Sequence, residues 1–471
     1  MYDVTSSKAE EFIHDGEILE TISYAKKYKN DLTLINTILN KAREMKGLSH
    51  REAMVLLECD IKEINEEIYD LAREIKQKFY GNRIVMFAPL YLSNYCINGC
   101  TYCPYHYKNK TIVRKKLTQK EIEKEVMALQ DMGHKRLALE TGEDPMNSPL
   151  EYVLESIKTI YGIKHKNGQI RRVNVNIAAT TVENYKKLKD AGIGTYILFQ
   201  ETYHKENYEK LHPTGPKHNY EYHTEAMDRA MDGGIDDVGI GVLFGLNMYR
   251  YDFVGLLMHA EHLEAAKGVG PHTISVPRIR PADDIDTADF SNGISDEIFE
   301  KIVAVLRIAV PYAGMIISTR ESSEVRERVL ELGISQLSGG SKTSVGGYHK
   351  DAKKEHSEQF NIEDHRTLDE IVNWLLDLGY IPSFCTACYR EGRTGDRFMK
   401  LVKSGQIANI CQPNALMTLK EYLEDYASID TSQKGVDVIS EELKRIPNEK
   451  VKAKTSEYLE KLKDGKRDFR F

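Results

Sequence analysis

The chain has 471 residues, a net charge of −7 and 41% hydrophobic residues, enough to bury a large core. Acidic and basic residues are interspersed, and no basic stripe stands out that would neutralise phosphates, so we expect no nucleic-acid partner. The first residues are acidic and polar, and no apolar run approaches the ~20 residues that a membrane span needs. We therefore expect a cytoplasmic protein with no membrane partner.

Residues 1–82 are predicted to form a helical N-terminal extension. Helical periodicity continues through residues 7–80, with Ser49 placed to cap one helix and Gly81 placed to end the last. Cys59 follows the apolar spacing of its helix, so we interpret it as a small buried hydrophobic residue. The extension holds no ligand-like cluster, and we expect it to pack against the region after residue 82.

Residues 83–350 alternate short β-rich runs with amphipathic helical stretches. The eight runs are 84–90, 136–140, 173–178, 195–200, 237–244, 273–279, 315–319 and 334–338. Eight such alternations predict an α/β fold, a closed (β/α)8 barrel of the TIM type. An open six-stranded partial barrel, with the last two runs outside it, is the alternative. In such barrels the chemistry lies at the C-terminal ends of the strands, so ligands are expected after each run.

Three cysteines, Cys96, Cys100 and Cys103, follow the first run with the spacing C-x3-C-x2-C. Three thiolates on one loop can hold three irons of a cubane iron-sulfur cluster and leave the fourth iron open for an exogenous ligand. A zinc knuckle is the alternative, but zinc sites usually close with a fourth Cys or His, and Pro104 and Tyr105 come next here. An open iron predicts chemistry at the cluster.

Polar residues follow several of the later runs. They are Thr141, Gly142, Glu143 and Asp144 after the second run, Glu201 after the fourth, Arg278 and Arg280 after the sixth, Arg320 after the seventh and Ser338 after the eighth. An arginine at a strand end is costly unless paired, so each is either a salt-bridge partner or an anchor for a carboxylate ligand. The glycine-rich loop 338–344 would suit a phosphate or an amino-acid carboxylate equally.

Residues 351–471 are predicted to form an α-helical C-terminal domain. Cys385, Cys388 and Cys411, spaced C-x2-C-x22-C, form a second three-cysteine set that is again one ligand short of a closed site. In a reducing compartment such sets are metal ligands more often than disulfides. A zinc site completed by a distant histidine is the alternative to a second cluster.

The loop 96–103, with Tyr102 just before its last cysteine, resembles the signature loop of the radical S-adenosylmethionine (SAM) enzymes. The resemblance implies that the open iron of a 4Fe-4S cluster takes the amino and carboxylate groups of SAM, donates an electron and releases a 5'-deoxyadenosyl radical. The strand-end segment 141–144 resembles the motif that contacts the methionyl amine of SAM, with Thr141 in place of the more usual glycine. Glu201 is a further candidate to accept hydrogen bonds from SAM or from a substrate ammonium.

The order of the motifs TGEDP, FQETYH, PRIRP and STRES along a barrel with a helical N-terminus resembles the aromatic amino-acid lyase branch of these enzymes. Two members of that branch act on tyrosine, the 2-iminoacetate synthase of thiamine biosynthesis and the tyrosine lyase that matures FeFe-hydrogenase. The C-terminal C-x2-C-x22-C set is typical of the maturase and is not expected in the thiamine enzyme. We therefore favour the maturase, with the 2-iminoacetate synthase as the alternative.

The maturase resemblance implies that L-tyrosine is cleaved to p-cresol and dehydroglycine at the barrel cluster. Dehydroglycine would become carbon monoxide and cyanide at a second 4Fe-4S cluster on Cys385, Cys388 and Cys411, bridged through free L-cysteine to a fifth iron. That iron would leave carrying CO, cyanide and cysteine. An external electron donor and the FeFe-hydrogenase maturation machinery are the implied partners.

The resemblance also assigns roles at the substrate and at the fifth iron. Arg320 and Ser338 lie at adjacent strand ends and would hold the carboxylate of the amino acid. His272 directly precedes the sixth run, where it would lie at the bottom of the barrel and bind the fifth iron, with His259 and His262 as alternatives. Two other classes of protein are alternatives to an enzyme of this branch: a non-catalytic iron-sulfur scaffold and a zinc-stabilised barrel that binds another small molecule.

Overall fold

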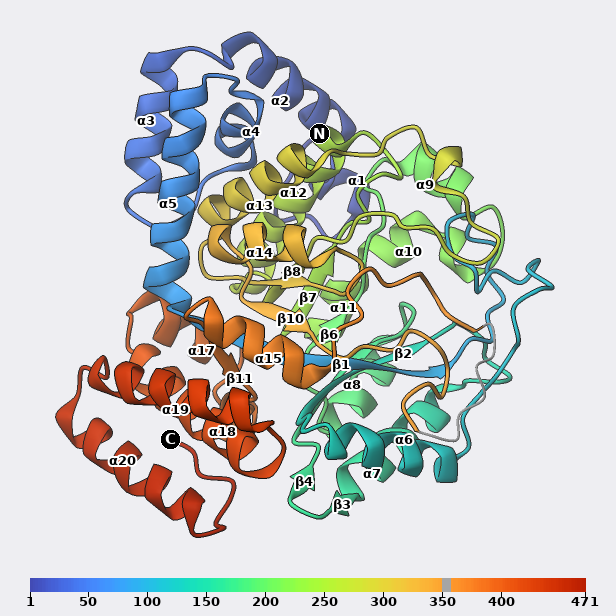
Figure 1. Ribbon diagram of the computed structural model, residues 1–471. Coiled ribbons are helices and arrows are strands. Elements are labelled where there is room, and N and C mark those ends of the chain that lie inside the picture. The colour runs from blue at the N-terminus through green and yellow to red at the C-terminus, as the bar shows by residue number, and fades with distance from the viewer. Residues whose placement is uncertain (350–356) are drawn as a thin grey trace.

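The computed structural model describes residues 1–349 and 357–471 (Figure 1). The N-terminal extension is helical, as predicted. Its helices are α1 (Ala9–Phe12), α2 (Asp15–Tyr28), α3 (Leu32–Ala42), α4 (His50–Glu58) and α5 (Lys62–Tyr80). Ser49 caps α4 in a capping box with Glu52, α5 ends at Gly81, and Cys59 is a free, buried thiol. The extension covers α12, α13 and α14 on the outside of the barrel (Figure 1).

Eight parallel strands form a closed barrel, which confirms the (β/α)8 prediction. They are β1 (Arg83–Ser93), β2 (Arg136–Thr141), β5 (Arg172–Asn176), β6 (Tyr196–Ile197), β7 (Val238–Gly241), β8 (Thr273–Ser275), β9 (Gly314–Ile317) and β10 (Gln336–Ser338). Each strand pairs with the next, and β10 returns to β1 with Val85 opposite Gln336. Because this last pairing exists, the six-stranded partial barrel is wrong.

Helices between the strands cover the barrel. They are α6 (Gln119–Asp131), α7 (Leu150–Gly162), α8 (Val182–Asp190), α9 (Lys205–Leu211), α10 (Tyr220–Thr224), α11 (Ala226–Asp232), α12 (Tyr249–Lys267), α13 (Asp296–Ala309) and α14 (Ser323–Leu332), with short 3-10 helices at Pro216–His218 and Thr287–Asp289 and a hairpin of β3 (Lys164–His165) and β4 (Gly168–Gln169). No helix within the described residues is long and apolar enough to cross a membrane.

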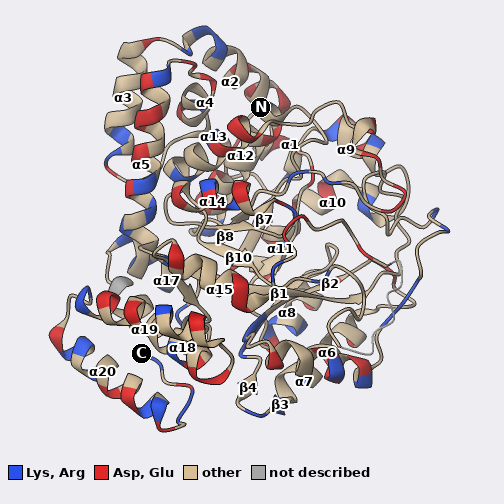
Figure 2. Cartoon of the chain, in the orientation of Figure 1, with Lys and Arg blue, Asp and Glu red and all other residues tan. Residues whose placement is uncertain are grey.

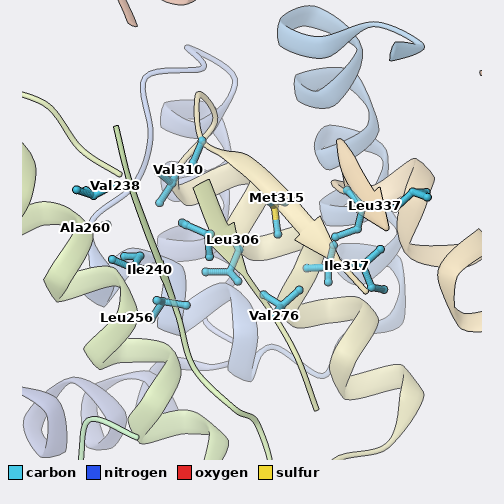
Figure 3. Close-up of a cluster of buried hydrophobic side chains, with 14 of the residues drawn as sticks. Val238, Ile240, Leu256, Ala260, Val276, Leu306, Val310, Met315, Ile317 and Leu337 are labelled. Carbon is cyan, nitrogen blue, oxygen red and sulfur yellow. The ribbon is translucent and has the colours of Figure 1, made fainter. Parts of the chain in front are cut away.

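The outward-facing residues of the strands form the core between strands and helices. Val238 and Ile240 of β7 lie near Leu256 and Ala260 of α12, and Met315 and Ile317 of β9 lie near Leu306 of α13 (Figure 3). These side chains are all buried. Since side chains alternate along a strand, the residues between them point into the barrel, where the ligands would bind.

The C-terminal region is helical, but it contains a strand, β11, that the sequence did not indicate. Its elements are α15 (Leu368–Asp377), β11 (Ile381–Ser383), α16 (Ala387–Arg390), α17 (Gly395–Lys403), α18 (Ala408–Asp425), α19 (Ile429–Lys444) and α20 (Glu449–Lys463). β11 pairs with Arg83–Val85, at the start of β1 below the point where β2 pairs with it. The C-terminal helices thereby cover the bottom of the barrel (Figure 1). The boundary expected between residues 350 and 351 lies outside the described residues.

Charged side chains follow the same division between surface and core. Lysine, arginine, aspartate and glutamate alternate along the outer helices, whereas the barrel strands carry few of them (Figure 2). One exception lies between the barrel and α18, where the buried Glu421 faces Lys135 at 3.5 Å and Arg171 at 3.0 Å. This ion-pair group links the two regions.

Candidate active site and second cysteine site

We call the end of the barrel where the strands have their C-termini the upper end. It holds a cavity of about 250 Å³, and residues of the first cysteine loop line this cavity. Cys96, Cys100 and Cys103 all line the cavity, directly after β1. The next strand end fixes the loop: the amide of Ile97 donates to the carbonyl of Glu143 at 2.9 Å, and Asn98 Nδ2 donates to Glu143 Oε2 at 2.6 Å. The two motifs singled out in the sequence therefore form one unit.

The thiols of the upper site lie deep in the barrel end, and the nearby Lys217 offsets only part of the effect of burial on Cys100 and Cys103. Burial raises the pKa of Cys100 far above its ordinary value and that of Cys103 to about 12. Such thiols ionise only when a cation binds, which suits a metal cluster. Within the described part of the chain no three His, Cys, Asp or Glu side chains are placed to hold a single ion. All three cysteines line the same cavity, as the ligands of one cluster would.

Most of the residues predicted to contact SAM lie in this cavity. Tyr102, Thr141, Gly142 and Glu143 line it. Asp144 does not, because its carboxylate accepts hydrogen bonds from the amides of the next turn at 2.9 Å, which explains it as a turn-stabilising residue.

Glu201 also lines the cavity, and it brings in a lysine that the sequence pattern does not single out. Glu201 Oε1 accepts from Lys217 Nζ at 2.7 Å, and that ammonium lies 5.7 Å from the centre of the Tyr102 ring. Burial alone would lower the pKa of Lys217, but the Glu201 carboxylate and the Cys100 thiol raise it, so the lysine stays charged. The only signal in the sequence is a lysine after Gly-Pro in the loop following α9, which periodicity does not distinguish from a solvated residue.

The three strand-end arginines divide into two kinds. Arg278 and Arg280 both pair with the buried Glu321, so they are salt-bridge partners. Arg320 lines the cavity, stacks on Phe360 at 3.6 Å and has no carboxylate partner among the described residues. Its unpaired guanidinium is therefore the one available to an anionic ligand.

Ser338 lies beside Arg320 at the end of the neighbouring strand. Its hydroxyl lines the cavity and accepts from the amide of Thr319 at 3.3 Å, which ties it to the residue before Arg320. The glycines that follow have a packing role instead of a phosphate-binding one: a Cβ on Gly339 or Gly340 would approach Leu368 within 3.1–3.5 Å. The loop 338–344 thus packs on the start of α15.

The second cysteine set lies at the opposite end of the barrel. Cys385, Cys388 and Cys411 line a second cavity of about 100 Å³ together with His272. His272 Nε2 is 2.8 Å from the Tyr389 hydroxyl, and its Nδ1 is 3.3 Å from Asp237 Oδ1. The structure thus brings together all four residues that the sequence assigned to the second site.

The two alternative histidines lie elsewhere. His259 and His262 are buried in α12, where His259 is 2.8 Å from the Tyr203 hydroxyl and His262 is 2.7 Å from the carbonyl of Val4. Neither lines the second cavity. Both are core histidines that face α12's neighbours and not the second cysteine set, so the geometry favours His272 as a ligand.

Arginines lie around the second site, of which Arg136 is buried and Arg83 and Arg393 are half-buried. Arg136 donates to the carbonyl of Cys385 at 2.8 Å and, like Arg83, lines the cavity. A hydrogen bond with the Cys411 thiol and the nearby Arg393 lower the pKa of Cys388, against the effect of burial. A thiolate in positive surroundings is a suitable ligand for iron, so the donor set and its charges fit a cluster.

The two cavities share the same strands. On β1, Val85 lines the lower cavity and Phe87 lines the upper one. On β10, Gln336 lines the lower cavity and Ser338 lines the upper one. Both pairs are neighbours on the inward face of the strand, because side chains alternate. The two cavities thus adjoin inside the barrel, although the two cysteine sets lie at its opposite ends.

Comparison with known proteins agrees with this arrangement. The family model of the radical SAM superfamily matches residues 90–281, and that of the Biotin and Thiamin Synthesis associated domain matches residues 275–381. The 2-iminoacetate synthase of Salmonella typhimurium is 30% identical over 345 residues, which cover 73% of this chain and 89% of that protein.

Two solved structures match nearly the whole chain. The crystal structure of HydG, a maturase of the [FeFe]-hydrogenase, is 54% identical with a TM-score of 0.95, covering 98% of this chain and 100% of that one. The FeFe-hydrogenase maturase HydG from Carboxydothermus hydrogenoformans is 40% identical with a TM-score of 0.83, covering 96% and 99%. The chain therefore belongs to the radical SAM superfamily and, within it, to the HydG maturases of [FeFe]-hydrogenase, as a radical SAM enzyme that uses SAM and a 4Fe-4S cluster.

Proposed function

We propose that this enzyme cleaves L-tyrosine to p-cresol and dehydroglycine in the upper cavity and forms carbon monoxide and cyanide at the second cysteine site. The observation that carries the proposal is one barrel with a cysteine-lined cavity at each end, the upper of which holds an unpaired guanidinium. A 2-iminoacetate synthase would need the upper site alone. The second site supports the maturase reaction.

In the upper site Cys96, Cys100 and Cys103 would hold the cluster that supplies the electron for reductive cleavage of SAM. The chain's own contribution is to position SAM against it. Glu143, Thr141 and the Glu201–Lys217 pair face the same cavity and can hold the charged groups of its methionyl end. Because the cavity is enclosed by the barrel strands, it also keeps water away from a reactive radical.

The substrate would be held by its carboxylate. The planar fork of Arg320 can donate two hydrogen bonds to it, and the Ser338 hydroxyl can donate a third. Phe360 fixes the guanidinium by stacking, so little side-chain freedom is lost on binding. Such fixed contacts select which hydrogen of the amino acid meets the radical.

In the second site Cys385, Cys388 and Cys411 would hold another 4Fe-4S cluster, and His272 would hold the fifth iron that free L-cysteine bridges to it. Arg83 and Arg136 would offset the negative charge of this assembly. Iron carrying CO, cyanide and cysteine is the proposed product, delivered to the hydrogenase maturation machinery. An external donor would supply the electrons.

A product assay after anaerobic reconstitution tests whether p-cresol forms at the upper site and carbon monoxide at the second cysteine site. With dithionite, SAM and L-tyrosine, the parent should form p-cresol and carbon monoxide, whereas Cys385→Ser/Cys388→Ser should form p-cresol with little carbon monoxide. Cys59→Ala is the matched control, since Cys59 is buried in the N-terminal helices and should change neither product. A parent that makes p-cresol but no carbon monoxide favours 2-iminoacetate synthase, and a parent that makes neither product contradicts the proposal.

The role of His272 is tested by iron content. His272→Ala, reconstituted with iron, sulfide and L-cysteine, should bind about one iron fewer per chain than the parent while forming p-cresol at the parent's rate, since His272 lies at the opposite end of the barrel. His259→Ala, also a buried histidine, is the control that should keep the full iron content if it folds. Equal iron in parent and His272→Ala would exclude His272 as a ligand.

A further inference from the structure

Glu140 is a carboxylate in the upper cavity that the sequence pattern does not single out. It lies near the C-terminal end of β2, opposite Tyr91 of β1 and Asn176 of β5 in the parallel register. All three side chains line the cavity, because they occupy inward-facing positions of their strands. Glu140 thus lies within the barrel, one inward position before Gly142.

Glu140 has no basic partner within the described residues. The group that influences it most, apart from burial, is the guanidinium of Arg320, which favours the charged form without forming an ion pair, and the side chain of Asn176 provides a hydrogen bond. Burial outweighs both and raises the pKa of Glu140 to about 8. Near pH 7 the empty cavity thus holds a mostly protonated carboxyl group near the Arg320 guanidinium, and an ammonium placed next to that carboxyl would favour its ionised form again.

An α-amino acid carries the two complementary charges on adjacent atoms. Its carboxylate matches Arg320, and its ammonium matches Glu140. We propose that Glu140 binds the α-ammonium of the substrate and accepts one of its protons, so that the amino acid is presented to the radical as a neutral amine. This inference rests on the proposed function, because it assigns a role toward the same substrate.

The proposed step is a proton transfer and balances without any other reactant. The N–H bond of the ammonium breaks, its electron pair stays on nitrogen, and an O–H bond forms on Glu140. Ammonium and carboxylate become amine and carboxylic acid, so the net charge of the cavity does not change. A carboxyl group whose pKa lies near that of an α-ammonium can take this proton at little cost.

Other titratable and charged groups near Glu140 are Tyr91 from β1, Tyr105 from the cysteine loop, and Arg320. Burial raises the pKa of both phenols well above their ordinary value, so they remain neutral. Arg320 has a pKa lowered by burial yet stays a cation near neutrality. Glu140 is therefore the member of this group that can exchange a proton near pH 8.

Binding measurements separate this role from a merely structural one. The holoenzyme with SAM but without reductant would be dialysed against L-tyrosine and against 3-(4-hydroxyphenyl)propionate, which keeps the carboxylate and ring but lacks the amine. The Kd of the parent for tyrosine should be at least about ten-fold lower than its Kd for the propionate, as expected for a charged hydrogen bond in a buried site. Glu140→Gln should bind both compounds within about two-fold of each other, while Glu123→Gln, an exposed residue of α6, should behave as the parent.

The pH dependence of turnover gives a second readout. Residual p-cresol formation by Glu140→Gln should rise between pH 7 and pH 9, because only substrate that is already deprotonated would react, and Glu140→Asp should recover part of the parent's rate at pH 7. SAM cleavage without substrate checks that the cluster is intact in each variant.

The outcomes distinguish this inference from the proposed function. A Glu140→Gln variant that keeps the parent's preference for tyrosine overturns the role of Glu140 and leaves the tyrosine-lyase proposal standing. A parent that neither binds tyrosine nor forms p-cresol overturns both.

Discussion

At the scale of single residues, the upper site depends on close approaches that a side chain would prevent. Gly142 is the clearest case, because a Cβ at this position would lie 2.3 Å from the carbonyl oxygen of Tyr95 and 3.1 Å from Cys96 Cβ. Glycine lets the end of β2 touch the cysteine loop, and the amide of Gly142 donates to the carbonyl of Ser93 at 3.0 Å. In the TGE motif, Gly142 thus allows the close contact with the cysteine loop, and Glu143 supplies the carboxylate.

Gly142→Ala should therefore displace the cysteine loop. We expect the variant to fold but to retain less than about half of the upper-site iron after reconstitution, because backbone contact below 3 Å forces the loop to move. Iron and sulfide analysis in a Cys385→Ser/Cys388→Ser background isolates the upper cluster. Gly293→Ala is the control, since a Cβ there meets no atom within 4 Å. Full iron content in Gly142→Ala would contradict the packing argument.

Arg320 should control the affinity for the amino acid. Arg320→Lys keeps a positive charge but loses the bidentate fork and the stacking on Phe360, so the KM for L-tyrosine should rise about 10–100-fold, equivalent to about 1.5–3 kcal/mol. SAM cleavage without substrate should stay at the parent's rate. An unchanged KM would show that the carboxylate binds elsewhere.

At the scale of elements, α12 supports the loop that carries Glu201. Asp252 on this helix is fully buried, and its Oδ1 accepts from Thr202 Oγ1 and from the amide of Tyr203, each at 2.8 Å. Glu201 itself adopts a left-handed conformation with φ 68°, which an L-residue keeps only where its surroundings hold it. A helix outside the barrel therefore fixes a side chain inside it.

Asp252 makes the stability of this element depend on pH. Burial raises its pKa from 3.8 to about 7, so between these values the folded chain holds a proton that the unfolded chain has released. The contribution of Asp252 to the free energy of unfolding therefore falls as the pH rises from about 4 to 7. Asp252→Asn keeps an oxygen acceptor and removes this titration, so its Tm relative to the parent should increase between pH 5 and pH 8, by the equivalent of up to about 2.5 kcal/mol.

Thermal unfolding at several pH values checks the Asp252 prediction. Asp190→Asn, at the exposed end of α8, is the control and should show no such trend. A Tm difference between Asp252→Asn and the parent that does not change with pH would contradict the assignment.

At the scale of the whole molecule, the barrel and the C-terminal helices are joined by a buried charge group. Glu421 of α18 and Lys135 of the barrel both have fully buried side chains, and Arg171 completes the group. Burial and the neighbouring Arg171 lower the pKa of Lys135 to about 8, against the attraction of Glu421. Two cations therefore share the Glu421 carboxylate across this interface, and Arg171 also pairs with Asp468 at 3.4 Å.

Removing that carboxylate should loosen the lower site. Glu421→Gln leaves Lys135 and Arg171 without an anion between them and should cost about 3–5 kcal/mol of stability. Carbon monoxide formation should fall more than p-cresol formation, since the C-terminal helices carry the second site. Glu424→Gln, one turn along α18 and paired with Lys420, is the matched control. Equal losses of both products would contradict a local effect.

The sequence alone predicted the closed barrel, both cysteine sets and most of the strand-end residues that line the upper cavity. These predictions succeeded because they depend on local spacing: alternating runs give strands, and barrel geometry brings their C-terminal ends together. β11 was missed because it has only three residues, including Pro382, and is a strand only through its pairing with β1.

The tertiary structure decided what spacing cannot express, namely which charges meet. Arg278, Arg280 and Arg320 are alike in sequence, but the buried Glu321 pairs with the first two, and the third has no carboxylate partner among residues 1–349 and 357–471. His272, which directly precedes β8, lines the second cavity, whereas His259 and His262 of α12 do not. Glu140 and Lys217 gave no signal because their roles depend on desolvation and on partners far along the chain. Local patterns thus determine the elements, whereas burial and charge pairing arise only when the elements pack.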